Sequence, residues 1–205
     1  MANEITTYAE IIAAIPTWYM DRTDLTPYAD VILDLSEAYF NVNLRVREME
    51  TVDDLTPVSN VCTLPTDFIE AQRVVEQASI RRQLEFITPE MVDVWYPDRG
   101  SGLSDHYTIV GETLTAYPLS SNDIELTYWA EIPPLTSLNT TNWLLTKSPN
   151  LYLHTCLMYA AEFAKDANQF AQEAALVTRF VELVNNSGQR AKFGNAAVVQ
   201  RGPTP

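Results

Sequence analysis

The stretch SPNLYLHTCLMYAAEFAKDANQFAQEAALVTRFVELV, residues 148–184, predicts a long helix. Ser148 suits the N-cap of a helix and Pro149 its first position. Apolar residues then recur at steps of three and four, which is typical of one buried helix face. At a rise of about 1.5 Å per residue this helix would be about 50 Å long, more than a core element of a compact domain needs. The seam consists of Tyr152, Cys156, Tyr159, Phe163, Ala167, Phe170, Ala174, Val177, Val181 and Val184.

The two halves of this stretch differ in character. A second apolar row from Leu153 to Ala164 widens the stripe in the first half, so we expect residues 149–163 to lie in the core. The polar run KDANQ, residues 165–169, interrupts the pattern, and we expect two helices in line or one bent helix. The alanine-rich second half would contact a neighbouring copy of the chain. The residues of this predicted contact face are Phe170, Ala171, Ala174, Val177 and Val181.

Two further helices are predicted near the N-terminus. Thr6 or Thr7 caps a short amphipathic helix that Pro16 ends. A second helix begins near Pro27, with Thr26 as its N-cap, and ends near Met49. Its predicted core seam, which would pack against residues 149–163, is Tyr28, Val31, Ile32, Leu35, Ala38, Tyr39, Val42 and Val46.

Between the helical parts the pattern changes to short strands and turns. Prolines and small polar residues interrupt the chain from Val52 onward, and alternation of apolar and polar residues replaces the helical period. The predicted strands are residues 58–63, 68–76, 80–86, 106–110 with 113–118 as a hairpin, and 123–129; a short helix follows Thr88. The sequence therefore predicts an α+β fold, a helical bundle with an inserted antiparallel β lobe and an extended C-terminal tail. The predicted bounds are 1–56 with 136–188 for the helical body, 57–135 for the β lobe and 189–205 for a C-terminal arm.

Composition excludes several classes of function. The 205 residues are 46% hydrophobic, enough for one sizeable core, and the net charge of -14 argues against a surface that grips nucleic acid. The two cysteines, Cys62 and Cys156, lie far apart, and reduced thiols are expected. Neither a signal peptide nor an apolar run long enough to cross a membrane is present in the sequence, so we expect no membrane partner.

Candidate catalytic and metal-binding residues are few. The two histidines, His106 and His154, have no metal-ligand spacing around them, and neither a nucleophile elbow nor a phosphate-binding loop occurs. A catalytic arrangement assembled only in space stays open at this point. The paired carboxylates Asp53–Asp54 and Asp21 with Asp24 leave one enzyme hypothesis, glycosidase chemistry across an aromatic-walled cleft. We expect no enzyme, no cofactor and no metal, because these acids are better explained by helix ends and exposed connectors.

Several motifs in the same order resemble a known family. They are Arg22-Thr23-Asp24-Leu25, Leu44-Arg45-Val46-Arg47-Glu48-Met49, Tyr107-x-Ile109-x-Gly111 and Asn142-Trp143-Leu144-Leu145. As a set, with the helical and β segments around them, they resemble the head-to-tail adaptor, or connector, proteins of tailed bacteriophages, in particular short-tailed phages. The resemblance covers nearly the whole chain to about residue 185.

The resemblance implies a structural virion protein rather than an enzyme. It implies a homo-oligomeric ring, commonly of twelve copies, below the portal protein and above a downstream tail or nozzle protein. DNA would pass through the channel without specific binding, as an acidic wall favours. The protein would be made in the host cytoplasm and reside in the virion tail, below the portal vertex. The alternative is a phage cell-wall-degrading or carbohydrate-active protein that uses the paired carboxylates.

The C-terminal residues reverse the charge of the rest of the chain. After Val184 the sequence NNSGQRAKFGNAAVVQRGPTP has no acidic residue and no helical period. Two interpretations stay open, a disordered terminus or an arm that orders on a partner. The resemblance implies that such an arm reaches the portal, and its predicted contact residues are Arg190, Lys192, Phe193, Val198, Val199 and Arg201.

Overall fold

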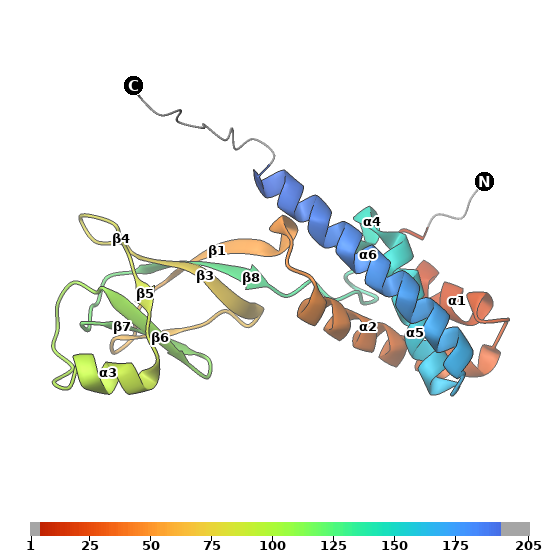
Figure 1. The fold of residues 1–205 in the computed structure, drawn as a ribbon, viewed down its shortest axis with the longest axis horizontal. Coiled ribbons are helices and arrows are strands. Elements are labelled where there is room, and N and C mark those ends of the chain that lie inside the picture. Colours follow the sequence, from red (N-terminus) through yellow and green to blue (C-terminus); the bar gives the residue numbers. More distant parts are fainter. Residues whose placement is uncertain (1–4, 194–205) are drawn as a thin grey trace, which may run out of the picture. The chain divides into compact units, whose positions relative to one another are not determined.

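The chain folds into two compact units. The structure, a computed structural model, describes residues 5–193. The helical unit comprises Met1–Glu48 and Ile132–Pro205, and the β unit comprises Met49–Glu131. The predicted α+β class is confirmed, with helices in the first unit and two sheets in the second (Figure 1). The β unit begins eight residues earlier than the predicted lobe, because Glu50–Leu55 forms a strand.

The first helix begins where the sequence predicts. Helix α1 spans Tyr8–Trp18, and Thr7 and Glu10 cap it reciprocally through side-chain bonds to each other's backbone N–H groups. The prediction that Pro16 ends the helix was wrong by two residues. A proline in the last turn removes only one backbone bond, and the Thr17 hydroxyl donates to the Ala13 carbonyl in the same turn, at 3.0 Å.

The second helix starts later and ends earlier than predicted. Thr23–Tyr28 forms a 3-10 helix, η1, that contains Pro27, and α2 spans Ala29–Asn43 without a side-chain cap. The chain leaves the helix at Leu44, which is extended, and a 3-10 turn, η2, follows at Arg47–Met49. The predicted helix to Met49 is therefore wrong.

The long C-terminal stretch forms a helical hairpin. Helix α4 (Trp143–Lys147) precedes α5 (Pro149–Phe163), and α6 (Ala167–Phe193) follows after a three-residue turn. The expected break is confirmed, but the expectation of helices in line was wrong, because α6 folds back along α5 (Figure 1). Lys165 adopts φ 56°, which reverses the chain, and the Asp166 carboxylate accepts the N–H groups of Asn168 and Gln169 to start α6.

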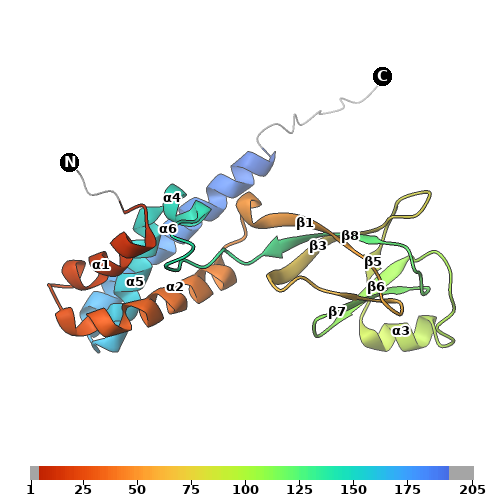
Figure 2. The same ribbon diagram turned by 180° about the vertical axis from the view of Figure 1, so that it is seen from behind.

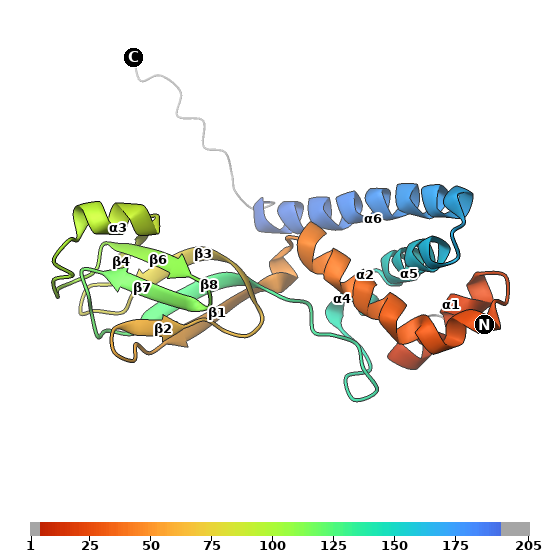
Figure 3. The same cartoon turned by 90° about the horizontal axis from the view of Figure 1, so that it is seen from below.

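Helix α5 is the centre of the helical unit. It contacts α1, α2, α4 and α6 (Figure 3), and Figure 2 shows α1 and α2 from the side opposite to α6. Its residues are buried on nearly every side, as expected for a central helix. The predicted packing of residues 149–163 against the second helix is confirmed by Phe40 and Tyr152, whose rings meet edge to face at 4.8 Å.

Helix α6 runs nine residues past Val184, where the sequence pattern predicts its end. Two contacts with the end of α2 hold this extension. The Asn185 side chain accepts the Arg45 N–H at 3.1 Å and donates to the Asn43 carbonyl at 3.1 Å, so it satisfies two backbone groups that α2 leaves open. Gly188 lets the backbone of α6 approach Val46, since a Cβ there would lie 3.0 Å from Val46 Cγ1. At this position the contact requires a small residue rather than an apolar one, so the apolar period does not mark the end of the helix.

We predict that Gly188→Ala lowers the free energy of unfolding by about 1–2 kcal/mol, because overpacking outweighs the roughly 1 kcal/mol that alanine gains in a helix. Val46 is buried, and the added Cβ would also lie 3.3 Å from its backbone Cα. Urea unfolding followed by circular dichroism measures the change. Asn186→Ala, on the exposed side of the same turn, is the matched control. In a chain that also carries Val46→Ala, Gly188→Ala should lower the free energy of unfolding by less. An equal decrease in that chain would contradict the close-contact explanation.

The β unit is a sandwich of two four-stranded sheets. One has the order β1-β8-β3-β4 and is antiparallel, and the other has the order β2-β7-β6-β5, with β5 and β6 parallel. Leu126 of β8 and Leu114 of β7 are fully buried in the shared core between the sheets. Helix α3 (Pro89–Trp95) packs beside β6. The strands are β1 (Glu50–Leu55), β2 (Val61–Thr63), β3 (Phe68–Glu76), β4 (Arg82–Gln83), β5 (Glu85–Phe86), β6 (His106–Val110), β7 (Thr113–Tyr117) and β8 (Ile124–Ala130).

Most predicted strands are confirmed, and one is divided. Residues 68–76, the hairpin of β6 and β7, and residues 124–129 form strands as expected. The predicted strand at 80–86 was wrong as a single element, because β4 joins one sheet and β5 the other. Leu84 lies between them and is buried in the shared core, so the chain crosses from sheet to sheet there.

Candidate functional site: exposed apolar surfaces

The predicted contact face of α6 is partly covered within the chain. Val177 was wrongly placed on this face: its side chain is fully buried, because α6 turns this side toward α5. Phe170 and Ala171 are exposed, and Ala174 and Val181 are half-buried. The His154 ring, from α5, also meets this covered side, with Nδ1 2.7 Å from Glu173 Oε2 and the ring stacked on Phe180. Only part of the predicted face is thus free for a neighbouring copy.

The predicted arm lies mostly beyond the described residues. Arg190, Lys192 and Phe193 belong to the last turns of α6. Val198, Val199 and Arg201 lie outside the described residues. Their contact with a portal stays a prediction.

Helix α2 exposes the apolar seam that the sequence assigns to the core. Of the predicted seam, Ile32 and Val46 are buried, but Val31, Leu35 and Val42 are 56%, 47% and 74% exposed. The opposite side of α2, with Leu33, Ser36, Glu37 and Phe40, faces the core instead. The prediction chose the wrong face because both sides of α2 are apolar, and the inward side carries a serine and a glutamate. A count of apolar residues around the whole helix could have shown that one seam would be left over.

The exposed seam forms one wall of a groove with α5. The groove has a volume of about 350 Å³ and is lined by Tyr28, Val31, Ile32, Leu35, Tyr159, Glu162 and Phe163. The Tyr28 and Phe163 rings lie 4.7 Å apart at one end, so the two helices are held together there. Phe163 is about half exposed. An open groove with apolar walls in this position suits another polypeptide segment better than a small molecule.

A second exposed region lies where α1 ends and α6 begins. A hollow of about 470 Å³ has Trp18, Met20, Arg22, Lys165 and Asn168 in its lining. Trp18 is 62% exposed and Met20 85% exposed. Met20 and Asp21 both have positive φ, so the chain turns sharply and holds the methionine outward.

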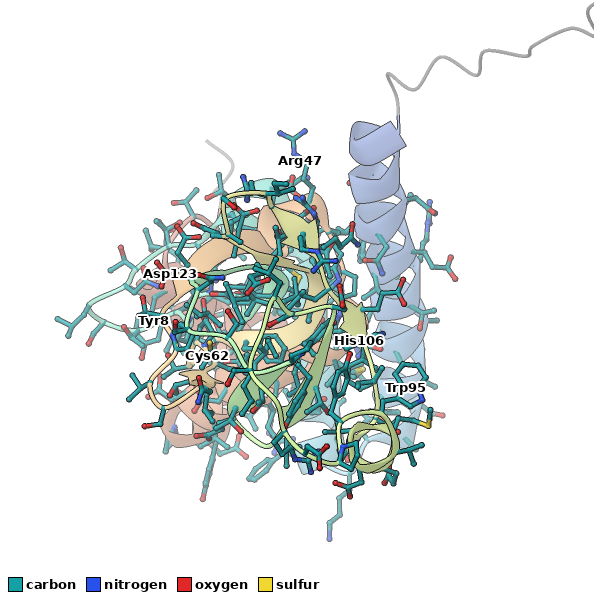
Figure 4. The ribbon with its side chains drawn as sticks, turned by 90° about the vertical axis from the view of Figure 1, so that its left-hand side faces the viewer. Tyr8, Arg47, Cys62, Trp95, His106 and Asp123 are labelled. Atoms are coloured by element: carbon teal, nitrogen blue, oxygen red, sulfur yellow. The ribbon has the colours of Figure 1, made fainter. Side chains whose placement is uncertain are left out.

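The β unit has its own exposed apolar patch on α3. Met91, Val94 and Trp95 are exposed on this helix. Figure 4 shows Trp95 beside His106, and their rings meet edge to face at 5.0 Å. The Tyr96 hydroxyl lies 2.7 Å from His106 Nδ1, which ties α3 to β6. His106 therefore has a structural partner among the aromatic residues.

Charge is divided unequally between the units. Residues 49–131 contain fifteen acidic residues and four arginines. The rest of the chain contains twelve acidic and nine basic residues, of which three basic residues and no acidic one follow Glu182. The β unit thus carries most of the negative charge of the chain.

A buried polar network joins α2, α5 and the segment that returns from the β unit. Glu37 is buried and its Oε1 accepts the Leu135 N–H at 2.9 Å and the Tyr152 hydroxyl at 3.2 Å. Asn142 donates to the Tyr152 oxygen at 2.6 Å and accepts the Leu145 N–H at 2.8 Å. Burial raises the pKa of Glu37 to about 7, against the lowering effect of its two donors.

The remaining candidates for chemistry do not come together. Arg22 binds the Asp24 carboxylate with two nitrogens. In the other pair, the Asp53 carboxylate accepts the Asp54 N–H, and the Asp54 carboxylate accepts a hydrogen bond from the Gln77 side chain. The two carboxylate pairs belong to different units. Among the described residues, no group of three or more metal-ligating side chains occurs. Burial raises the pKa of the Cys156 thiol to about 12 and that of Cys62 to about 11, so neither offers a thiolate at neutral pH.

We predict that Glu37→Gln changes how stability depends on pH. Between pH 4.5 and about 7 the folded chain holds a proton on Glu37 that the unfolded chain releases, so stability from this group falls as pH rises through that range. The neutral glutamine does not titrate, so the variant does not lose stability in this way. Between pH 5 and pH 8 the free energy of unfolding of the variant, relative to that of the natural chain, should rise by up to about 3 kcal/mol.

Urea unfolding at both pH values measures this difference. Glu182→Gln, on the exposed side of α6, is the control and should show no such gain. A constant difference between the Glu37→Gln variant and the natural chain at all pH values would contradict the buried, protonated carboxyl.

Comparison with known proteins identifies a family. A family model described as SU10 adaptor protein matches residues 6–201, which covers both units. A search of curated proteins found no match. Over the described residues, no helix has both the length and the apolar character needed to cross a bilayer.

Proposed function

The chain belongs to the SU10 adaptor protein family, a family of structural bacteriophage proteins, and on that premise we propose that it forms a ring between the portal and the next tail component. In this proposal the ring extends the channel through which DNA leaves the capsid. Copies of the helical unit form the body of the ring, and the β unit faces the downstream tail or nozzle protein. The family match carries the proposal, because it spans nearly the whole chain.

The exposed seam of α2 supports the association of copies. A ring of identical subunits joins two different surfaces of each copy, so each must present at least one face that is unsatisfied when alone. Large apolar side chains stay exposed at Val31, Leu35 and Val42 of α2 and at Tyr28 directly before it. Isolated exposed apolar residues are common, but a continuous helical row of them indicates an interface.

The negative charge supports passage of DNA without binding. Phosphate contacts need clustered lysine and arginine, and the β unit has fifteen acidic residues against four arginines. A channel wall of this composition would repel the duplex and keep it moving. An enzyme is not favoured, since Arg22 binds Asp24, the Asp53 carboxylate accepts the Asp54 N–H, and the two carboxylate pairs lie in separate units.

We expect the purified protein to decorate isolated portal rings. Negative-stain imaging with and without portal rings would show an added ring of density on one face. A protein that ignores portals and clears peptidoglycan in a turbidity assay would instead favour the cell-wall-degrading alternative.

The α3 patch should serve the downstream contact. Val94→Asp places a charge among exposed apolar side chains, and it should abolish recruitment of the tail component by portal-bound rings while leaving portal decoration unchanged. Val110→Asp, another exposed valine in the β unit, is the matched control. Co-sedimentation measures recruitment of the tail component. Equal recruitment by the two variants would exclude the α3 patch as the contact with that component.

A further inference from the structure

We propose that Leu138, at the tip of the loop between β8 and α4, inserts into the groove between α2 and α5 of a neighbouring copy. This contact rests on the proposed function, because the proposed ring places copies of the chain side by side. It gives each copy two different contact surfaces, a projecting leucine and an apolar groove. A ring of identical subunits needs such a complementary pair of surfaces.

The loop that carries Leu138 is held in shape by its own hydrogen bonds. The Thr136 N–H donates to the Asn139 carbonyl at 2.9 Å, and the Thr136 hydroxyl accepts the N–H groups of Leu138 and Asn139 at 3.2 and 2.9 Å. The Asn139 side chain donates to the Pro134 carbonyl at 2.7 Å. A loop fastened in this way loses little conformational freedom when a partner covers it.

Leu138 has the most exposed large apolar side chain among the described residues, at 97%. Figure 3 shows the segment between β8 and α4 as a loop that projects from the helical unit. Singly exposed apolar residues are common on protein surfaces. This one is held outward by an ordered turn, so it is withdrawn from water only when another surface covers it.

The loop is uncharged, which suits contact between two acidic copies. Residues 132–146, IPPLTSLNTTNWLLT, contain no charged side chain, although the chain has a net charge of -14. Other exposed apolar side chains of the helical unit lie beside acids, such as Met20 beside Asp21 and Leu183 beside Glu182. A contact through the loop between 132 and 146 therefore adds no repulsion between like charges.

The groove complements such an anchor in polarity. Val31 and Leu35 are each about half exposed along it, and Glu162 is the one charged residue among the described residues that line it. The Ser137 hydroxyl, next to Leu138, would donate to this carboxylate. An anchor flanked by acids would instead be repelled by it.

The loop and the groove lie on opposite flanks of α2. On the loop side, the Tyr8 N–H donates to the Thr140 carbonyl at 2.7 Å, and the Tyr8 hydroxyl donates to Asp30 of α2 at 2.5 Å. On the other side, Leu35 lines the groove with α5. At 3.6 residues per turn, Leu35 points about 140° away from Asp30 around the helix axis. Each copy thus presents the leucine on one flank and the groove on the other.

The same copy cannot place its own leucine in its own groove. Leu138 lies two residues from Thr140, a span of at most about 7 Å. Thr140 is held at the backbone of Tyr8, whereas the far end of the Tyr8 side chain contacts α2. Helix α2, roughly 10 Å across, then stands between the loop and the groove. A neighbouring copy meets no such obstacle, and the contact repeated from copy to copy closes a ring.

The small size of the contact decides when it forms. Stable interfaces bury about 1,200–2,000 Å² in total, far more than one loop tip and one groove supply. Isolated copies should therefore pair weakly in dilute solution. The contact should form when a portal ring holds copies side by side and so raises their effective concentration.

Cooperative filling of portal rings tests the contact between copies. Portal rings are titrated with full-length protein, and the bound copies are counted after co-sedimentation. Leu138→Asp should raise the concentration for half-filling by about tenfold or more, as expected for the loss of one buried leucine, and should remove the cooperativity. Binding of the first copy, measured with portal rings in excess, should stay unchanged.

Val58→Asp is the matched control, because Val58 is also an exposed apolar residue at a tight turn. It should change neither the half-filling concentration nor the cooperativity. If Leu138→Asp weakens binding of the first copy as much as it weakens filling, the portal is the partner of the loop and the proposal is overturned. Filling that is equal for the two variants would also overturn it.

Cysteine pairing between two differently tagged chains locates the partner surface. One full-length chain carries Leu138→Cys and the other Leu35→Cys, and the mixture is oxidised with diamide on portal rings and, separately, in concentrated solution. The natural cysteines are buried in both chains. The mixed dimer should form in roughly fivefold higher yield than when Val42→Cys replaces Leu35→Cys. Val42 is more exposed than Leu35 on the same helix but does not line the groove, so equal yields would overturn the proposal.

A chain with both Leu138→Cys and Leu35→Cys, diluted as a monomer, should form no internal disulfide, and an internal disulfide would contradict the placement of α2 between the two sites. Decoration of portal rings without the mixed cross-link leaves the adaptor function standing and rejects this contact. The mixed cross-link in concentrated protein that ignores portal rings does the reverse. Absence of the cross-link under both conditions rejects the contact.

Discussion

The orientation of α2 depends on one buried carboxyl group. Glu37 accepts the Leu135 N–H and the Tyr152 hydroxyl, and Asn41 on the next turn accepts the Ile132 N–H at 3.0 Å. These bonds fasten the segment that returns from the β unit onto α2. A buried N–H without a partner is costly, so this polar side must face inward. The apolar seam on the other side of α2 is thereby turned outward, which is why the protein alone leaves it uncovered.

The hairpin of α5 and α6 determines what remains free for assembly. A positive φ at Lys165 reverses the chain, and the side chains of Val177 and Val184 on α6 are then buried within the same copy. The far end of α6 is held by Asn185 and by the close approach of Gly188 to Val46. These contacts fix the direction in which α6 leaves the helical unit.

Sequence patterns predicted elements well and their partners poorly. Helices at 149–163 and near Tyr8, and the strands around Gly111, follow from periodicity, caps and turn residues, which act locally. The prediction of which face of α2 is buried was wrong, because both faces are apolar and the inward face differs only by Ser36 and Glu37. The hydrogen-bond donor to Glu37 comes from Leu135, which is distant in the sequence. The hairpin was missed because helices in line and a hairpin have the same period. The exposed groove could not be predicted, since it depends on which face of α2 is turned outward beside α5.

The two kinds of surface in this protein suit opposite tasks in one assembly. Apolar side chains that stay exposed on α2 gain free energy only when another chain covers them, so they favour lasting contact between proteins. The excess of carboxylates in the β unit does the reverse for DNA, because repulsion of phosphate acts over a Debye length of about 8 Å at physiological salt and needs no contact.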